Sequence, residues 1–274
     1  MSRRNQLNRN FFDRALVQPV GRQIYALGRA RQPPAQSTAT KFFRNLDQLT
    51  SFEGPLSDIV KQPSMRVLVA GCSMGCEAFS IAAFLAVHFP ALDWHIDASD
   101  IADDALAVAK AGVYGSEHGL GSLLPTRAAE LEHRLFARQG ERWFVRDDMR
   151  ARVSFANADV LAADFSARTG YDLVFGQNFM IHMSAADEAR AFSQLVAVTR
   201  QSGALFVGGM DLDRRPCLVQ SHGLTPVNWK ITDIHNADDM RRSAWPWSYW
   251  SLEPIDLTAR PFLERYCTIY WKRN

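Results

Sequence analysis

Cysteine is scarce in this sequence, and long hydrophobic runs are missing. The 274 residues include only Cys72, Cys76, Cys217 and Cys267, and no pair of them has metal-ligand spacing. We therefore expect reduced thiols in a cytoplasmic protein and no zinc or other metal site. No apolar run approaches the ~18 residues that a transmembrane helix needs, so we also expect no membrane span.

An excess of charge is missing too, apart from one segment. The net charge of +2 points to no particular partner, and we do not expect nucleic acid to be one. Residues 1–35, however, hold seven arginines against one acid, Asp13, with apolar residues at roughly helical spacing. We expect a basic helical arm here, either a solvated helix or a docking element for an acidic partner, ended by the Pro-rich linker Arg31–Thr40.

A glycine turn follows the first buried strand. The run Arg66–Ala70 is apolar and rich in β-branched residues, and helical periodicity begins after a turn that contains Gly71, Ser73 and Gly75. A parallel strand that enters a helix through glycines presents unpaired backbone N–H groups, against which a nucleotide-like ligand can bind. We therefore expect contacts to such a ligand at this turn.

Strands and helices alternate from this point on. The pattern predicts strands at 66–70, 94–99, 152–156, 172–176 and 204–208, and helices at 76–88, 102–111, 126–138 and 185–199. This order indicates an α/β fold, with a mostly parallel twisted sheet and helices on both faces. Within a main domain at 36–274 we also expect a helix start at 41–49, a small β insertion at about 139–156, an aromatic cap at about 212–262 and an antiparallel last strand at 266–272.

The glycine turn permits two interpretations. As a nucleophile elbow, it would make Ser73 the nucleophile of an α/β hydrolase; however, the several strands and the oxyanion segment that normally precede an elbow are missing. As a nucleotide loop, it requires an acid at the tip of the second strand. Asp100 occupies that tip, where a carboxylate can accept both ribose hydroxyls and also cap the helix that follows. Asp159 and Val160 follow the next main strand, where an adenine would be held.

Several segments match, in order, the motifs of one enzyme family. Residues 38–44 read TATKFFR, similar to N/T-x-T-x-F-F-R, and residues 70–80 read AGCSMGCEAFS, similar to AGCSTGEEPYS. Residues 98–101 read ASDI as in that family, and residues 172–182 read DLVFGQNFMIH, similar to D-x-I-x-C-R-N-x-M-I-Y. Over about Thr38–Gly209 the chain thus resembles the CheR-type methyltransferases, which esterify glutamates of chemotaxis receptors.

This resemblance implies a Rossmann-like class I methyltransferase. Its cofactor is then S-adenosylmethionine (SAM), which is released as S-adenosylhomocysteine, with Glu77 near the ammonium of the methionine end. The resemblance also supports Asp100 as the ribose ligand. The expected cofactor-binding residues are Thr38, Thr40, Arg44, Gly71, Ser73, Gly75, Glu77, Asp100, Ile101, Asp159, Val160, Gln177 and Asn178.

The substrate half departs from the family pattern. His182 replaces the tyrosine after Met-Ile, the GHSE block is replaced at 208–213, and the Trp-rich segment 229–250 has no evident counterpart. Ahead of the first strand, after residue 44, Lys61 and Arg66 are the only basic residues before Gly71, and neither is an evident active-site arginine. The N-terminal helical domain is also shortened. These departures favour a small-molecule or glycan acceptor over a protein one.

We therefore predict O-methylation of a small-molecule or glycan hydroxyl. A hydroxyl must lose a proton as it attacks, and a histidine at position 182 can accept it, so His182 is a candidate general base; alternatively, it caps the next helix. Asp211 and Asp213 are second candidates for orienting the substrate, and the Trp-rich segment is either a packed lid or a platform for a sugar ring. The alternatives are a protein-glutamate methyltransferase of chemotaxis type, a SAM-binding sensor and, more remotely, the Ser73 hydrolase.

Overall fold

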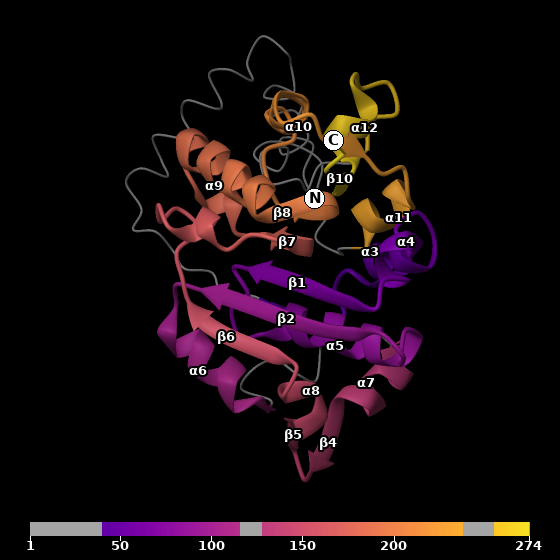
Figure 1. Ribbon diagram of the computed structural model, residues 1–274, viewed down its shortest axis with the longest axis vertical. Helices are drawn as coiled ribbons and strands as arrows, with labels where there is room; N and C mark the ends of the chain where they lie inside the picture. The colour runs from indigo at the N-terminus through magenta and orange to yellow at the C-terminus, as the bar shows by residue number, and fades with distance from the viewer. Residues whose placement is uncertain (1–39, 116–127, 238–254, 274) are drawn as a thin grey trace, which may run out of the picture.

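The structure is a computed structural model that describes residues 40–115, 128–237 and 255–273 (Figure 1). The predicted basic arm, Thr38 and the central part of the predicted aromatic cap lie outside these residues. No helix among the described residues is long and apolar enough to cross a membrane.

A seven-stranded sheet forms the centre of the fold, in the strand order β6-β2-β1-β7-β8-β10-β9. Five strands run parallel, namely β1 (Ser64–Ala70), β2 (Asp93–Asp100), β6 (Val153–Asn157), β7 (Tyr171–Gln177) and β8 (Thr199–Gly208). The strand β10 (Ile269–Trp271) lies antiparallel between β8 and β9 (Thr225–Pro226). The predicted Rossmann-like α/β fold with an antiparallel last strand is therefore confirmed.

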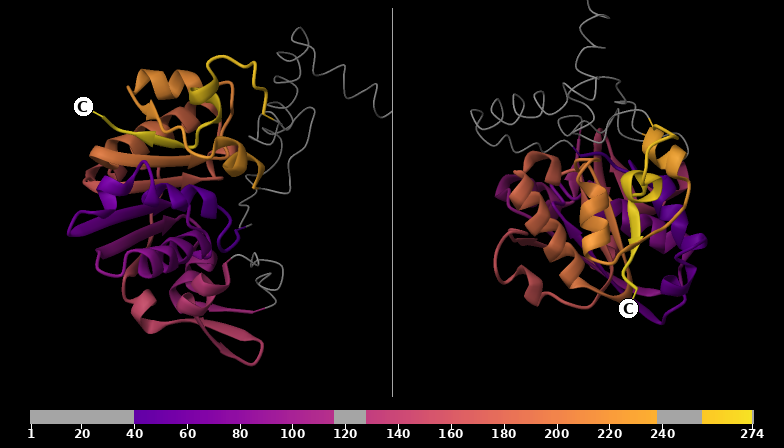
Figure 2. Two further views of the ribbon diagram at one scale, coloured as in Figure 1. Left: turned by 90° about the vertical axis from the view of Figure 1, so that its right-hand side faces the viewer. Right: turned by 90° about the horizontal axis from the view of Figure 1, so that it is seen from above.

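Helices cover both faces of this sheet. Alternate residues of its strands therefore belong to two separate hydrophobic cores, one on each face. Val67 and Val69 of β1 lie in one hydrophobic core with α5 (Cys76–His88), whereas Leu68 and Ala70 lie in the other core with α9 (Ala185–Val198). Burial on both faces explains why β1 is a continuous apolar run and does not alternate with polar residues. Figure 2 shows these layers from two further directions.

Shorter helices complete the layers. The α-helices are α3 (Leu46–Leu49), α4 (Ser57–Val60), α6 (Asp103–Ala111), α7 (Ala129–Leu135), α8 (Asp147–Arg150), α10 (Arg215–Ser221), α11 (Ile231–Asn236) and α12 (Phe262–Tyr266). The described residues also form the 3-10 helices η1 (Thr50–Glu53), η5 (Phe165–Ala167) and η6 (Met180–His182).

A second, three-stranded sheet forms the small insertion. It consists of β3 (Val113–Tyr114), β4 (Phe136–Gln139) and β5 (Arg142–Val145), paired antiparallel in the order β3-β5-β4. The β insertion expected at about 139–156 thus begins earlier in the chain and ends at Val145. The strand Val153–Asn157, which is included in the expected range, belongs to the large sheet. The aromatic rings of Phe136 and Tyr114 both pack edge-on against Phe42, which draws the insertion onto the main core.

Two predicted elements differ in detail from the structure. The expected helix start at 41–49 is a turn followed by the short α3. In the expected strand at 266–272, the first residue belongs to α12, and the backbone N–H of Cys267 donates to Leu263 O at 2.9 Å to close that helix. The strand β10 therefore begins only at Ile269, since an apolar, aromatic run is compatible with either structure.

Candidate functional site

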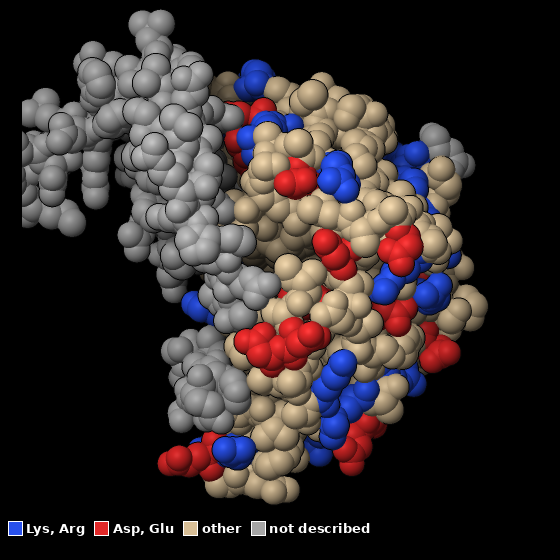
Figure 3. Space-filling view, turned by 90° about the vertical axis from the view of Figure 1, so that its left-hand side faces the viewer, with Lys and Arg blue, Asp and Glu red and all other residues tan. Residues whose placement is uncertain are grey.

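A cavity of about 280 Å³ lies at the carboxyl ends of β1, β2 and β7. The chain leaves β1 toward β2 on one side, and β7 pairs with β1 on the other side, so the strand order reverses at this point. Ligands of doubly wound sheets bind at such switch points. On the face that carries these strand ends, acidic and basic side chains are interspersed (Figure 3).

The turn after β1 forms one wall of the cavity and is shaped by residues with positive φ. Gly71, Ser73 and Gly75 have φ of 71°, 49° and 83°, respectively. A Cβ on Gly71 would stand 2.6 Å from Cδ1 of Phe179, so only glycine fits there without displacement. Gly75 does not line the cavity; its left-handed conformation begins α5.

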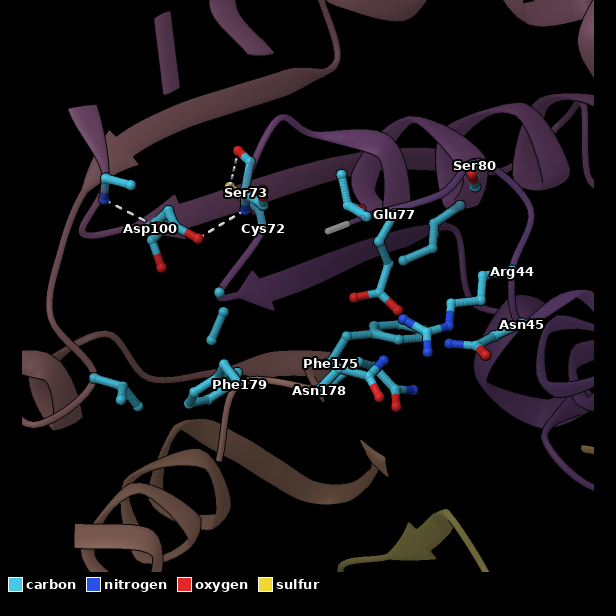
Figure 4. A pocket seen from close by; sticks show the side chains of 18 of the residues that line it. Arg44, Asn45, Cys72, Ser73, Glu77, Ser80, Asp100, Phe175, Asn178 and Phe179 are labelled. Carbon is cyan, nitrogen blue, oxygen red and sulfur yellow. Dashed lines mark hydrogen bonds between the residues drawn. The ribbon is translucent and has the colours of Figure 1, made fainter. Parts of the chain in front are cut away.

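Asp100 holds this turn in place from the tip of β2. Its Oδ2 accepts the backbone N–H of Ser73 at 2.7 Å, and its Oδ1 accepts that of Ala102 at 2.9 Å (Figure 4). Asp100 is expected from the sequence to cap the helix that follows β2. It instead caps the short turn between β2 and α6, through the backbone N–H of Ala102. Each carboxylate oxygen has a second lone pair, so Asp100 can also accept ribose hydroxyls.

Glu77, in the first turn of α5, lies at another part of the cavity wall. Figure 4 shows its carboxylate turned toward the Arg44 guanidinium and the Asn45 amide. Burial raises the pKa of Glu77 to about 7, although the charge of Arg44 and a hydrogen bond from Asn45 both lower it. At neutral pH the Glu77 carboxyl is thus only partly ionised, even with Arg44 beside it. A ligand with a positively charged group would stabilise the ionised form of Glu77, so this part of the cavity suits such a group.

The end of β7 supplies a third wall. Asn178 has a φ of 61°, and its backbone N–H donates to Gly208 O at 2.9 Å. The side chain of Gln177 is buried and donates to Gln48 Oε1 at 2.8 Å. The polar residues predicted from the segment 172–182 therefore reach the cavity together.

His182 also lines the cavity, from η6. It does not cap α9, because Ser184 does so: the Ser184 hydroxyl accepts the backbone N–H of Asp187 at 3.1 Å. The alternative of a helix-capping His182 is therefore wrong. Asp211 and Asp213 do not line the cavity; they pair with Arg214 and Arg265, respectively.

Most of the expected cofactor-binding residues come together in this one cavity. Those that line it are Thr40, Arg44, Gly71, Ser73, Glu77, Asp100, Ile101, Asp159, Val160, Gln177 and Asn178. The prediction missed Lys41, Phe43, Asn45, Phe175 and Phe179, which line it as well. Phe43 belongs to the motif recognised at 38–44, and Asn45 directly follows it. Phe175 and Phe179 lie at variable positions of the segment 172–182, where nothing in the sequence separates them from core residues.

The arrangement fits an elongated ligand with two different ends. The turn and Asp100 offer backbone and carboxylate groups to a nucleoside, and Glu77 with Arg44 offers opposite charges to an amino-acid group. The apolar rings of Phe43 and Phe175 lie among the lining residues. SAM, a nucleoside joined to a methionine zwitterion, has this chemical layout.

Comparison with known proteins agrees with this chemistry. Residues 38–214 match the family model of the CheR methyltransferase, SAM binding domain. The chain is 25% identical to a chemotaxis protein methyltransferase of Listeria monocytogenes, with 69% of this chain and 70% of the relative covered. It is 31% identical to chemotaxis protein methyltransferase 2 of Pseudomonas aeruginosa, where the corresponding shares are 53% and 52%.

Among solved structures, a TehB-like SAM-dependent methyltransferase from Corynebacterium glutamicum is similar at 13% identity and a TM-score of 0.44, with 82% of this chain and 94% of that chain covered. The family model spans well over half of the sequence, and all the residues that line the cavity lie within the matched range. The chain therefore belongs to the CheR methyltransferase family and is a SAM-dependent methyltransferase.

Proposed function

We propose that this enzyme transfers the methyl group of SAM to a carboxylate side chain of a protein and so forms a methyl ester. The observation that carries the proposal is the match to the CheR methyltransferase family, and Lys41 in the cavity wall adds a cation that can attract an anionic acceptor. The relatives named above are chemotaxis protein methyltransferases, which supports a protein acceptor. This acceptor differs from the small-molecule or glycan hydroxyl predicted from the sequence.

The cofactor is held at its two ends. Asp100 accepts the ribose hydroxyls while it keeps its bonds to the backbone of the turn. Glu77 pairs with the ammonium of the methionine end, which favours its ionised form over the partly protonated form of the free protein. Thr40, Asp159 and Val160 line the cavity and complete the cofactor contacts of this proposal.

The walls of the cavity favour the reaction itself. When bound, SAM would supply a sulfonium methyl group whose carbon an acceptor oxygen attacks in line, so that the C–S bond breaks and S-adenosylhomocysteine leaves as a neutral thioether. An attacking carboxylate is already anionic, so it needs no general base, and opposite charges are neutralised as the reaction proceeds. Phe43, Phe175 and Phe179 exclude water from the cavity wall, and a less polar surrounding favours a reaction in which charge disappears.

Methylation of a hydroxyl is the second candidate, since His182 lines the same cavity. In that reaction His182 accepts the proton that the hydroxyl loses. The two candidates predict different results for His182→Phe. A carboxylate acceptor leaves turnover within a few-fold of the native enzyme, whereas a hydroxyl acceptor lowers turnover by about 100-fold or more.

The chemical bond that is formed tests the proposal directly. The protein is incubated with methyl-labelled SAM and extract of its host, and the labelled material is separated into protein and small-molecule fractions before mild base is added. Label in protein that base releases as methanol supports the proposal. Base-stable label in the small-molecule or glycan fraction overturns it in favour of the hydroxyl candidate, and His182→Phe then has to abolish the labelling.

A further inference from the structure

A chain of two side-chain hydrogen bonds, one buried and one partly buried, reaches the cavity from the side of α3. Gln177 Nε2 donates to Gln48 Oε1 at 2.8 Å, and Gln48 Nε2 donates to Thr268 Oγ1 at 2.6 Å. Gln48 is 2% exposed and Gln177 is 6% exposed, so water cannot replace these bonds freely. Of the three residues, only Gln177 lines the cavity.

These bonds fix the direction in which the Gln177 carboxamide points. Its nitrogen is tied to Gln48, and its oxygen lies against β8, where a Cβ on Gly208 would collide with it. The nitrogen carries two hydrogens, and Gln48 takes one of them. The second hydrogen remains as a donor on a side chain that lines the cavity.

The same bonds tie Gln177 to the segment that carries the charged end of the site. α3 begins directly after Arg44 and Asn45, and the backbone N–H of Gln48 donates to Asn45 O at 3.0 Å. Gln48 therefore connects the end of β7 with the residues that face Glu77. A rotation of Gln48 would release the Gln177 amide and leave buried polar groups without partners.

We propose that Gln48 is a positioning residue for SAM: it holds the carboxamide of Gln177 so that the free N–H donates to the carboxylate of the methionine end. The inference rests on the proposed placement of that end beside Glu77. An arginine, which the family motif has at the position of Gln177, donates from every edge of its guanidinium. A carboxamide donates from one end only, so a glutamine here has to be held in one orientation.

A double-mutant cycle tests this role, with calorimetry of S-adenosylhomocysteine binding as the readout. Gln48→Met and Gln177→Met each keep the approximate volume and should each weaken binding about 3- to 10-fold, the loss of about one hydrogen bond. If Gln48 acts through Gln177, the double variant binds no more weakly than Gln177→Met alone. Losses that multiply, or a Gln48→Met variant with native affinity, overturn the inference.

Two further variants separate positioning from a general effect on folding. Gln48→Glu keeps an oxygen that accepts from Gln177 Nε2, so it should recover most of the affinity that Gln48→Met loses; a failure to recover it contradicts the inference. Gln62→Met, the same change on an exposed glutamine, should leave binding unchanged. The proposed carboxylate acceptor is tested separately by the base-labile methyl ester, so either idea can fail while the other stands.

Discussion

Glu77→Gln should make the cofactor-free protein more stable at high pH while it weakens SAM binding. The glutamate is held beside Arg44 in a partly buried position in the cavity wall, and desolvation there raises its pKa from 4.5 to about 7. The folded protein therefore binds the proton more tightly than the unfolded chain does. Protonated Glu77 is compatible with its site, so its contribution to the free energy of unfolding is fully present below pH 4.5. This contribution is lost as the pH rises from about 4.5 to about 7, because the folded protein then has to ionise Glu77. A glutamine has no proton to lose, so the variant escapes this cost.

The size of the effect follows from the two pKa values. Each unit of pKa difference corresponds to about 1.4 kcal/mol. Full ionisation of Glu77 in the folded state thus costs about 3 kcal/mol, of which roughly 1 kcal/mol is already present at pH 5.5. The free energy of unfolding of the variant should therefore exceed that of the native protein by about 2 kcal/mol more at pH 8.5 than at pH 5.5.

Urea unfolding of the cofactor-free proteins at these two pH values measures this difference. Glu130→Gln, at an exposed glutamate of α7, controls for the loss of one acidic charge. Calorimetry should show the opposite effect on function: the variant binds SAM about 10- to 100-fold more weakly, because a charge-assisted hydrogen bond to the ammonium is lost. A variant that is less stable than the native protein by the same amount at both pH values would refute the reasoning.

Substitutions at three further positions test other parts of the site. Asp100→Ala removes the acceptor of two backbone N–H groups as well as the ribose ligand, so SAM affinity measured by calorimetry should fall at least about 10-fold; unchanged affinity removes Asp100 from the site. Gly71→Ala places a Cβ against Phe179 at a positive φ and should lower the free energy of unfolding, measured in urea, by about 1–3 kcal/mol. A variant as stable as the native protein would contradict the requirement for glycine at position 71. Arg44→Gln removes a charge that lowers the pKa of Glu77, so the pH at which SAM binding reaches half of its high-pH affinity should rise, whereas Arg44→Lys should keep it.

The residues that could be predicted from the sequence are those whose local pattern defines their position. The apolar run before Gly71 predicts a buried strand, and a glycine turn after such a strand predicts a ligand-binding loop. Asp100 at the tip of the next strand then follows, because the carboxyl ends of parallel strands meet at one edge of the sheet. These inferences need only the order of elements along the chain.

Other features depend on contacts between segments that lie far apart in the chain, and no local sequence pattern predicts such contacts. Gln48 is a polar residue with no apolar pattern of its own, yet it is almost fully buried because Gln177 and Thr268 provide its partners. Phe179 is indistinguishable from a core residue until its ring is seen against the turn at Gly71. The two-residue strands β3 and β9 are too short for any periodicity.

The two carboxylates of the cavity prepare its two ends in different ways. Asp100 is engaged by two backbone N–H groups before any ligand arrives, so the nucleoside end is preorganised. Glu77 is partly buried and has a pKa of about 7, so at neutral pH it becomes fully ionised only when the ammonium of SAM pairs with it. Binding at pH 7 should therefore release a fraction of a proton, and the calorimetric enthalpy should vary with the ionisation enthalpy of the buffer. Glu77→Gln should abolish that variation, whereas Asp100→Ala should leave it in place; a native enthalpy that is the same in every buffer would contradict the assignment of the ammonium to Glu77.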